Sequence, residues 1–180
     1  MDRRAALKGF AIVSAGVIVL PSCLQTDSAR PASIALKNIS INAEQEMLLA
    51  ELSEFILPNT SSAANPVPAA QQYILMMVDD CYRKEDQEKF VKGLQQFNGF
   101  AKKQSGETFT HADAGMRTSL LKIIESKKDI PEEVLAFYES TKRLTIQNFT
   151  GSKYFLTTIR KYEMVPGRFH GCFPVADIKS

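Results

Sequence analysis

The chain alternates between apolar stripes at helical spacing and short segments rich in proline, glycine or small polar residues. Apolar residues that recur every three or four positions form the buried face of an α-helix. No strand pattern competes with this period, so the sequence predicts an all-α bundle of about five to six helices with a coil-rich C-terminus. The predicted helices cover residues 42–57, 69–82, 84–103, 130–149 and 152–160, with one more helix capped by Thr110.

Local signals at the predicted helix ends support these boundaries. Asn42 is a suitable N-cap, and Gln45 three residues later completes a capping-box pattern. Pro131 fits the first position of a helix, and Gly151 is expected to break the same helix. Gly93 lies inside a predicted helix, where it costs about 1 kcal/mol relative to alanine. We therefore expect Gly93 to allow close helix packing.

Polar and sulfur-containing residues of the helix predicted over 69–82 are interpreted as structural. Met76 and Met77 are expected to fill the core, and Cys81 is placed on the broad apolar face. Asp79 and Asp80 are adjacent, so on a helix their side chains point about 100° apart. They are interpreted as surface charges or local hydrogen-bond acceptors and not as an acid/base pair.

Residues 1–23 have the parts of an export signal. A basic start precedes a short apolar region, Gly9 to Leu20, and a membrane-spanning helix would need about 20 apolar residues. The start resembles the twin-arginine export motif, although Ala6 stands where that motif often has phenylalanine. The alternative is an ordinary secretory signal. The residues assigned to the export signal are Arg3, Arg4, Leu7 and Lys8.

The export signal ends in a sequence that resembles a bacterial lipobox. Leu20 and two further residues precede Cys23, which is the candidate lipidation site, although Pro21 is an unusual occupant. Residues 24–40 are then expected to be a polar linker that tethers a helical domain over residues 41–180 to a membrane.

Charge excludes one class of partner. The formal net charge of +2 is carried by the first ten residues, so the rest of the chain is neutral overall. Nucleic-acid binding needs a concentrated basic face. Nucleic acid is therefore not expected as a partner.

The cysteines and histidines of the chain raise the question of a disulfide bond and give no indication of a metal site. If Cys23 carries a lipid, Cys81 and Cys172 remain, and an exported protein favours their oxidation. An internal Cys81–Cys172 bridge and an intermolecular bond of Cys172 are both open, and one or both cysteines could instead be buried thiols. His111 and His170 are far apart in sequence, so no metal site is expected, and His111 is interpreted as a surface residue.

Residues 166–174, which we call the C-terminal strap, combine two prolines and two glycines with two phenylalanines, a histidine and a cysteine. Prolines and glycines exclude a regular element and favour tight turns. The strap either packs on the helical body or forms a docking surface for a partner. The candidate partner-binding residues are Pro166, Gly167, Arg168, Phe169, His170, Gly171, Cys172 and Phe173.

Several phrases together resemble the subunit 3 family of bacterial gluconate 2-dehydrogenase and related sugar dehydrogenases. They are a twin-arginine-like leader followed by Ile56–Thr60, Asp80–Tyr82, Phe149–Ser152 and Val165–Pro174. The likeness covers about residues 41–175, and the Pro-Gly…Gly-Cys-x-Pro ending is its most specific part. The loop Thr60–Pro68 departs from the acidic-Thr-Pro-Gly run that relatives tend to carry.

The resemblance implies a small subunit that binds no cofactor and does no chemistry. A separate FAD-dependent large subunit would oxidise the sugar or sugar acid, and a cytochrome c subunit would take the electrons. The small subunit would escort the flavoprotein through twin-arginine export to the periplasm, where a lipid anchor would hold the complex at the membrane. A free-standing envelope lipoprotein is the alternative, and an independent enzyme is disfavoured because no catalytic constellation is visible.

Overall fold

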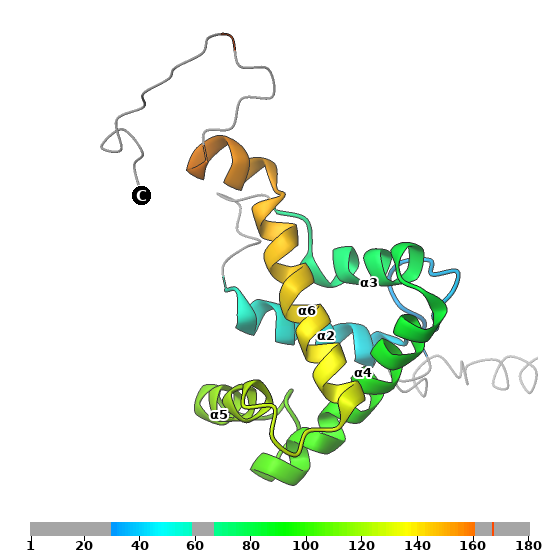
Figure 1. The fold of residues 1–180 in the computed structure, drawn as a ribbon, viewed down its shortest axis with the longest axis vertical. Helices are drawn as coiled ribbons and strands as arrows, with labels where there is room; N and C mark the ends of the chain where they lie inside the picture. Colours follow the sequence, from blue (N-terminus) through cyan, green and yellow to red (C-terminus); the bar gives the residue numbers. More distant parts are fainter. Residues whose placement is uncertain (1–29, 59–66, 161–166, 168–180) are drawn as a thin grey trace, which may run out of the picture.

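The chain folds into helices only, within the part that the structure describes. Figure 1 shows a computed structural model, which describes residues 30–58, 67–160 and 167. An isolated bridge joins Pro31 and Asn42, but the described residues contain no named strand. The predicted all-α fold is therefore confirmed. The helices are α2 (Ala43–Ile56), α3 (Ala70–Cys81), α4 (Lys84–Ser105), α5 (Ala114–Glu125), α6 (Glu132–Thr150) and the short π-helix η3 (Phe155–Ile159).

The predicted capping residues define several helix ends. The Gln45 amide donates to the Asn42 side chain at 2.9 Å, and the Asn42 amide donates to the Gln45 side chain at 3.0 Å. This reciprocal pair is the predicted capping box of α2. Gly106 ends α4 with φ of 83°, a left-handed conformation that favours glycine. Gly151 follows α6, as predicted.

The fourth helix begins later than predicted. Thr110 does not cap it; the N-cap is Asp113, whose side chain accepts a hydrogen bond from the Met116 amide. Residues 108–112 form a separate turn, in which the Ala112 amide donates to the Thr108 carbonyl. Arg117 stabilises this turn by donating to three of its carbonyl groups and by pairing with Glu51 of α2 at 3.1 Å. The start of α5 thus depends on contacts with Glu51, a residue of the distant helix α2.

The last predicted helix is shorter and of a different type. Residues 152–160 were expected to be helical, and residues 153–159 are, of which Phe155–Ile159 form the π-helix η3. The hydroxyl oxygen of Ser152, three residues before Phe155, accepts a hydrogen bond from the Phe155 amide at 3.1 Å. The Arg160 amide then donates to the Phe155 carbonyl, the five-residue spacing of a π-turn.

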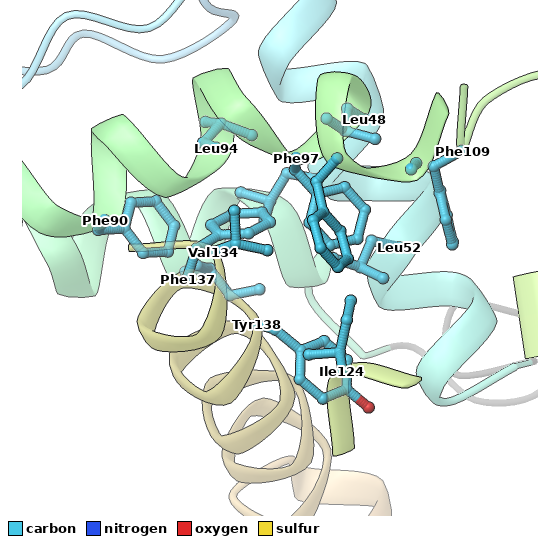
Figure 2. Close-up of a cluster of buried hydrophobic side chains, with 14 of the residues drawn as sticks. Leu48, Leu52, Phe90, Leu94, Phe97, Phe109, Ile124, Val134, Phe137 and Tyr138 are labelled. Carbon is cyan, nitrogen blue, oxygen red and sulfur yellow. The ribbon is translucent and has the colours of Figure 1, made fainter. Parts of the chain in front are cut away.

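Helix α6 crosses α2, α3 and α4 and forms its most extensive interface with α4 (Figure 1). A chain of edge-to-face aromatic contacts fills that interface (Figure 2). Phe97 lies 5.3 Å from Phe137 and 5.6 Å from Phe109, measured between ring centroids. Phe90 also packs on Phe137, at 5.1 Å. Such pairs add about 0.5–1.5 kcal/mol each to the burial of the rings.

Gly93 sits where α4 packs tightly against α6, which confirms the predicted role. A Cβ atom at Gly93 would lie 2.5 Å from the Phe137 Cβ and closer still to the Glu133 carbonyl oxygen. Both atoms belong to the first turns of α6, whose backbone cannot move aside alone. The absence of a side chain at Gly93 therefore sets the distance between the two helices.

The end of the predicted linker is part of the folded body. Ile39 and Ile41 are buried in the core, while Ala32, Ile34 and Leu36 pack against it. Residues 30–40 are thus not a free tether, which corrects the expectation for this part of residues 24–40. Apolar and polar residues alternate in this segment, and the apolar ones face the core. The interpretation of residues 24–40 as a polar linker did not take this alternation into account.

Asp79 fixes this N-terminal segment to the end of α3. Its carboxylate accepts hydrogen bonds from the backbone amides of Lys37, Asn38 and Ile39, at 2.8, 2.7 and 2.9 Å. Only 4% of Asp79 is exposed, so it is not the surface charge or local acceptor that was predicted. Its partners are about forty residues away in sequence, which is why the local pattern could not identify them.

The prediction for Met76 was also wrong. It was expected in the core but is 52% exposed, whereas Met77 packs against the core as predicted. The apolar stripe of α3 is narrower than its composition suggests, because Ile74, Leu75 and Val78 already fill the buried face.

One buried hydroxyl group in α6 leads to a stability prediction. Thr141 is fully buried, and its hydroxyl group has no hydrogen-bond partner. Burying such a group unpaired costs about 1–3 kcal/mol. Thr141→Val keeps the shape and removes the hydroxyl group, so we expect the free energy of unfolding to rise by about 1 kcal/mol in chemical denaturation.

Thr145 in the same helix is the matched control. Its hydroxyl group donates to the Thr141 carbonyl oxygen at 2.8 Å. Thr145→Val removes that hydrogen bond, so we expect it to destabilise the protein by about 1 kcal/mol. Equal losses of stability in both variants would contradict the prediction for Thr141.

Candidate partner-docking surface

The sequence-predicted interaction residues fall mostly outside the described residues. Gly167 alone of the C-terminal strap is described, and it is exposed. The others, to which no structural finding applies, are Pro166, Arg168, Phe169, His170, Gly171, Cys172 and Phe173, together with the export residues Arg3, Arg4, Leu7 and Lys8 and the lipidation residue Cys23.

A groove of about 380 Å³ lies where α3 passes into α4, against the side of α6. We call it the α3–α4 groove. Residues 81–90 form one wall, and Ala136, Ser140 and Arg143 of α6 form the other. The chain turns sharply here because Tyr82 and Arg83 have extended backbones between two helices. The groove thus brings together side chains that are about sixty residues apart in sequence.

Charged and aromatic groups line the α3–α4 groove. Arg143 donates a hydrogen bond to the Tyr82 hydroxyl group, and its guanidinium carbon lies 5.9 Å from the Tyr82 ring centroid. Arg83 pairs with Asp86 at 3.1 Å, and both side chains are largely exposed. A guanidinium group beside an aromatic ring at an exposed site is a composition typical of protein interfaces. No local sequence pattern predicts the pairing of Tyr82 with Arg143, because Arg143 comes from the distant helix α6.

Lys89 and Glu132 form an exposed ion pair beside the groove, at 2.8 Å. The hydrogen bond from Lys89 and the charge of Lys89 lower the pKa of Glu132, and Glu132 raises the pKa of Lys89 in return. Both groups are therefore held in their charged forms. Neither is adapted to exchange a proton near neutral pH.

Cys81 is the exposed thiol of this groove. It was predicted to lie on the buried face of its helix, but it is exposed and is the last residue of α3. Because α3 ends at Cys81, this side chain lies at the end of the helix, where it lines the groove. Cysteine is among the residues that proteins most often bury. The exposed position of Cys81 is therefore unusual.

A second depression, of about 430 Å³, lies between the end of α5 and the outer face of α6. Tyr138 donates to Glu125 at 2.7 Å, and Lys142 donates to the same carboxylate. Burial and the neighbouring Glu125 raise the pKa of Tyr138, whereas hydrogen bonds from Lys142 and Tyr138 lower the pKa of Glu125. Tyr138 thus stays protonated and Glu125 ionised near pH 7.

Three further features of the described residues bear on possible chemistry: His111, potential metal ligands and potential membrane-spanning helices. His111 is exposed, as predicted, and its ring shares a hydrogen bond with the Thr108 hydroxyl group at 2.9 Å. Among the described residues, no group of three histidine, cysteine or acidic side chains could hold a metal ion. In the same part of the chain, no helix is both long and apolar enough to cross a membrane.

One comparison with known proteins identifies a family. The model of the family described as Gluconate 2-dehydrogenase subunit 3 matches residues 43–167. This range contains α2 to η3 and the entire α3–α4 groove, and it ends at the second residue of the C-terminal strap. Neither a curated protein nor a solved structure matches the chain.

Proposed function

The chain belongs to the gluconate 2-dehydrogenase subunit 3 family, and we propose that it is the non-catalytic small subunit of a periplasm-facing, FAD-dependent gluconate or sugar dehydrogenase complex. The observation that carries this proposal is the family match over residues 43–167, which spans every described helix.

In this proposal the chemistry belongs to the partner. A large flavoprotein subunit carries the FAD and oxidises the substrate, and a cytochrome c subunit receives the electrons. This chain binds neither cofactor. It stabilises the flavoprotein and escorts it through export, since the twin-arginine route carries folded cargo. The leader that supports this role contains Arg3, Arg4, Leu7 and Lys8.

The folded N-terminal segment limits how far the body can lie from a lipid anchor at Cys23. Residues 30–41 are fixed by the Pro31–Asn42 bridge and by Asp79. Six residues lie between Cys23 and Arg30, and the seven steps from one to the other span at most about 25 Å when the chain is fully extended. A lipidated chain would therefore hold its body, and the complex, close to the membrane surface.

The partner contacts are proposed at the C-terminal strap and the α3–α4 groove. Arg168 of the strap offers a planar donor fork suited to a carboxylate of the flavoprotein. Arg143 and Tyr82 offer a second, aromatic and cationic contact. Both proposed contacts depend on an arginine, a residue type that is enriched in protein interfaces.

Export of the partner tests the escort role. Changing Arg3 and Arg4 together to lysine keeps the charge but removes the arginine pair that the twin-arginine route reads. We expect both this chain and its flavoprotein to remain in the cytoplasm, as measured by flavin content and immunoblots of cell fractions. Changing Lys84 and Lys92 to arginine, on the body, is the matched control and should leave export unchanged.

Two outcomes would contradict the proposal. A flavoprotein that reaches the periplasm normally with the lysine variant would exclude the escort role. A tagged chain that purifies from the envelope alone, without flavin absorbance, would exclude the complex and favour the free-standing lipoprotein.

A further inference from the structure

We propose that the α3–α4 groove receives an acidic segment of the flavoprotein subunit, and that a carboxylate of this segment binds Arg143. The occupant is thus an aspartate or glutamate side chain of another protein, not a small anion or a second copy of this chain. This inference deepens the proposed function, on which it rests for the identity of the partner. It adds the chemistry of the contact and the residue that makes it.

The first support is the charge balance around Arg143. This residue lines both the α3–α4 groove and the depression between α5 and α6. In the groove, Arg83 and Lys89 each pair with an acid, and the four other charged residues of the depression pair with one another. Arg143 is the one charged residue of these two surfaces that has no oppositely charged partner within the described part of the chain. Its charge is therefore available to a partner of opposite charge.

The second support is the orientation of the Arg143 guanidinium group. It donates a hydrogen bond to the Tyr82 hydroxyl group, and its central carbon lies 5.9 Å from the Tyr82 ring centroid. A guanidinium group has five N–H donors, so most of them remain for an incoming acceptor. Two of them can bind both oxygens of one carboxylate in a planar arrangement. Because Tyr82 holds Arg143 in place before the partner binds, less side-chain entropy is lost on docking.

The third support is the apolar surface next to Arg143. Ile146 lies about one helical turn further along α6, on the same face, and is 43% exposed. It lines the depression between α5 and α6, as Arg143 does. An arginine beside a tyrosine and an exposed apolar side chain is typical of the residues that dominate protein binding. A segment that crosses α6 at Arg143 would contact both the groove and Ile146.

The arrangement of charges also indicates the class of occupant. Nucleic acid and other polyanions need a concentrated basic face, whereas the cations on either side of Arg143 are already paired with acids of the body. One unpaired arginine matches one carboxylate. The occupant that suits both Arg143 and Ile146 is a protein segment with a carboxylate next to an apolar side chain.

Dissociation of the purified complex tests the contribution of Arg143. The complex is captured through a tag on the full-length chain and diluted in steps, and the flavin that stays bound gives the dissociation constant. We expect Arg143→Ala to raise this constant about 30-fold, the effect of losing one dominant interface residue. Arg143 is exposed, so the variant should unfold at the same temperature as the wild type. Arg160→Ala, at an exposed arginine that lines neither surface, is the matched control and should leave the constant unchanged.

Cross-linking identifies the group that faces Arg143. Arg143→Lys places an amine at this position, and a water-soluble carbodiimide then joins the amine to a neighbouring carboxylate through an amide bond. After digestion with trypsin, the cross-linked amine lies in the peptide of residues 143–153, which contains no aspartate or glutamate. We expect this peptide to be joined to an acidic peptide of the flavoprotein, and we expect no such product from the wild-type complex.

The outcomes separate this inference from the proposed function. If Arg143→Ala holds the flavoprotein as tightly as the wild type does, the inference is wrong and the proposed complex stands. The same conclusion follows if the peptide of residues 143–153 stays unlinked in a complex that has formed, or is joined only to acids of this chain or of a second copy. If the wild-type chain captures no flavoprotein, both proposals are wrong.

Discussion

Gly93→Ala is expected to lower the free energy of unfolding by about 2 kcal/mol. The added methyl group would lie 2.5 Å from the Phe137 Cβ and closer still to the Glu133 carbonyl oxygen, so α4 and α6 would have to separate. Overpacking of this kind costs about 1–3 kcal/mol and occasionally more. Alanine regains about 1 kcal/mol through its higher helix propensity, so the estimate starts from the upper end of the packing cost.

Gly99 in the same helix is the matched control. It is exposed, and a Cβ atom there would meet nothing within 4 Å. Gly99→Ala is therefore expected to stabilise the protein by about 1 kcal/mol through helix propensity alone. Chemical denaturation of both variants measures the difference. If Gly93→Ala stabilises the protein as much as Gly99→Ala does, α4 and α6 are not packed as described.

Asp79→Asn is expected to lower the free energy of unfolding at pH 7 by about 2 kcal/mol. The carboxylate accepts three backbone hydrogen bonds from residues 37–39, and hydrogen bonds to a charged group contribute about 1.5–3 kcal/mol. The side-chain oxygen of asparagine can still accept a hydrogen bond. Its NH₂ group, however, would face a backbone N–H group, and two donors cannot bond to each other. Asp80→Asn makes the same charge change at an exposed neighbour and should have little effect.

The effect of Asp79 should depend on pH. Burial alone raises the pKa of Asp79, but the hydrogen bonds from Lys37, Asn38 and Ile39 outweigh it, so the pKa lies below the ordinary value of 3.8. A lowered pKa in the folded state stabilises the protein fully above the unfolded pKa, and this stability is lost as pH falls through the folded pKa. The difference between wild type and Asp79→Asn should therefore shrink below about pH 4. A constant difference from pH 7 to pH 2 would contradict this role.

Helix positions were predictable because their signals are local. The capping box of Asn42 and Gln45 and the proline before α6 act within one turn of the backbone. Gly93 was also predictable as a packing position, since a glycine inside a helix costs stability and close packing of another helix can offset that cost.

The errors occurred where a distant partner decided the outcome. Asp79 is buried because residues 37–39 bind it, and residues 30–40 fold because the core accepts Ile39 and its neighbours. Asp113 and not Thr110 caps α5, because Arg117 and Glu51 hold the preceding turn. No window of ten or twenty residues contains these pairs.

The sequence by itself determined the all-α class, most helix positions, the neutral body and the resemblance to the subunit 3 family, because each depends on composition, period or contiguous motifs. Only the tertiary structure decided that Asp79 anchors the N-terminal segment, that Cys81 faces outward, and that α6 completes a groove with Tyr82. These features depend on which helix faces meet. That choice comes from packing the whole core, and a single helix does not specify it.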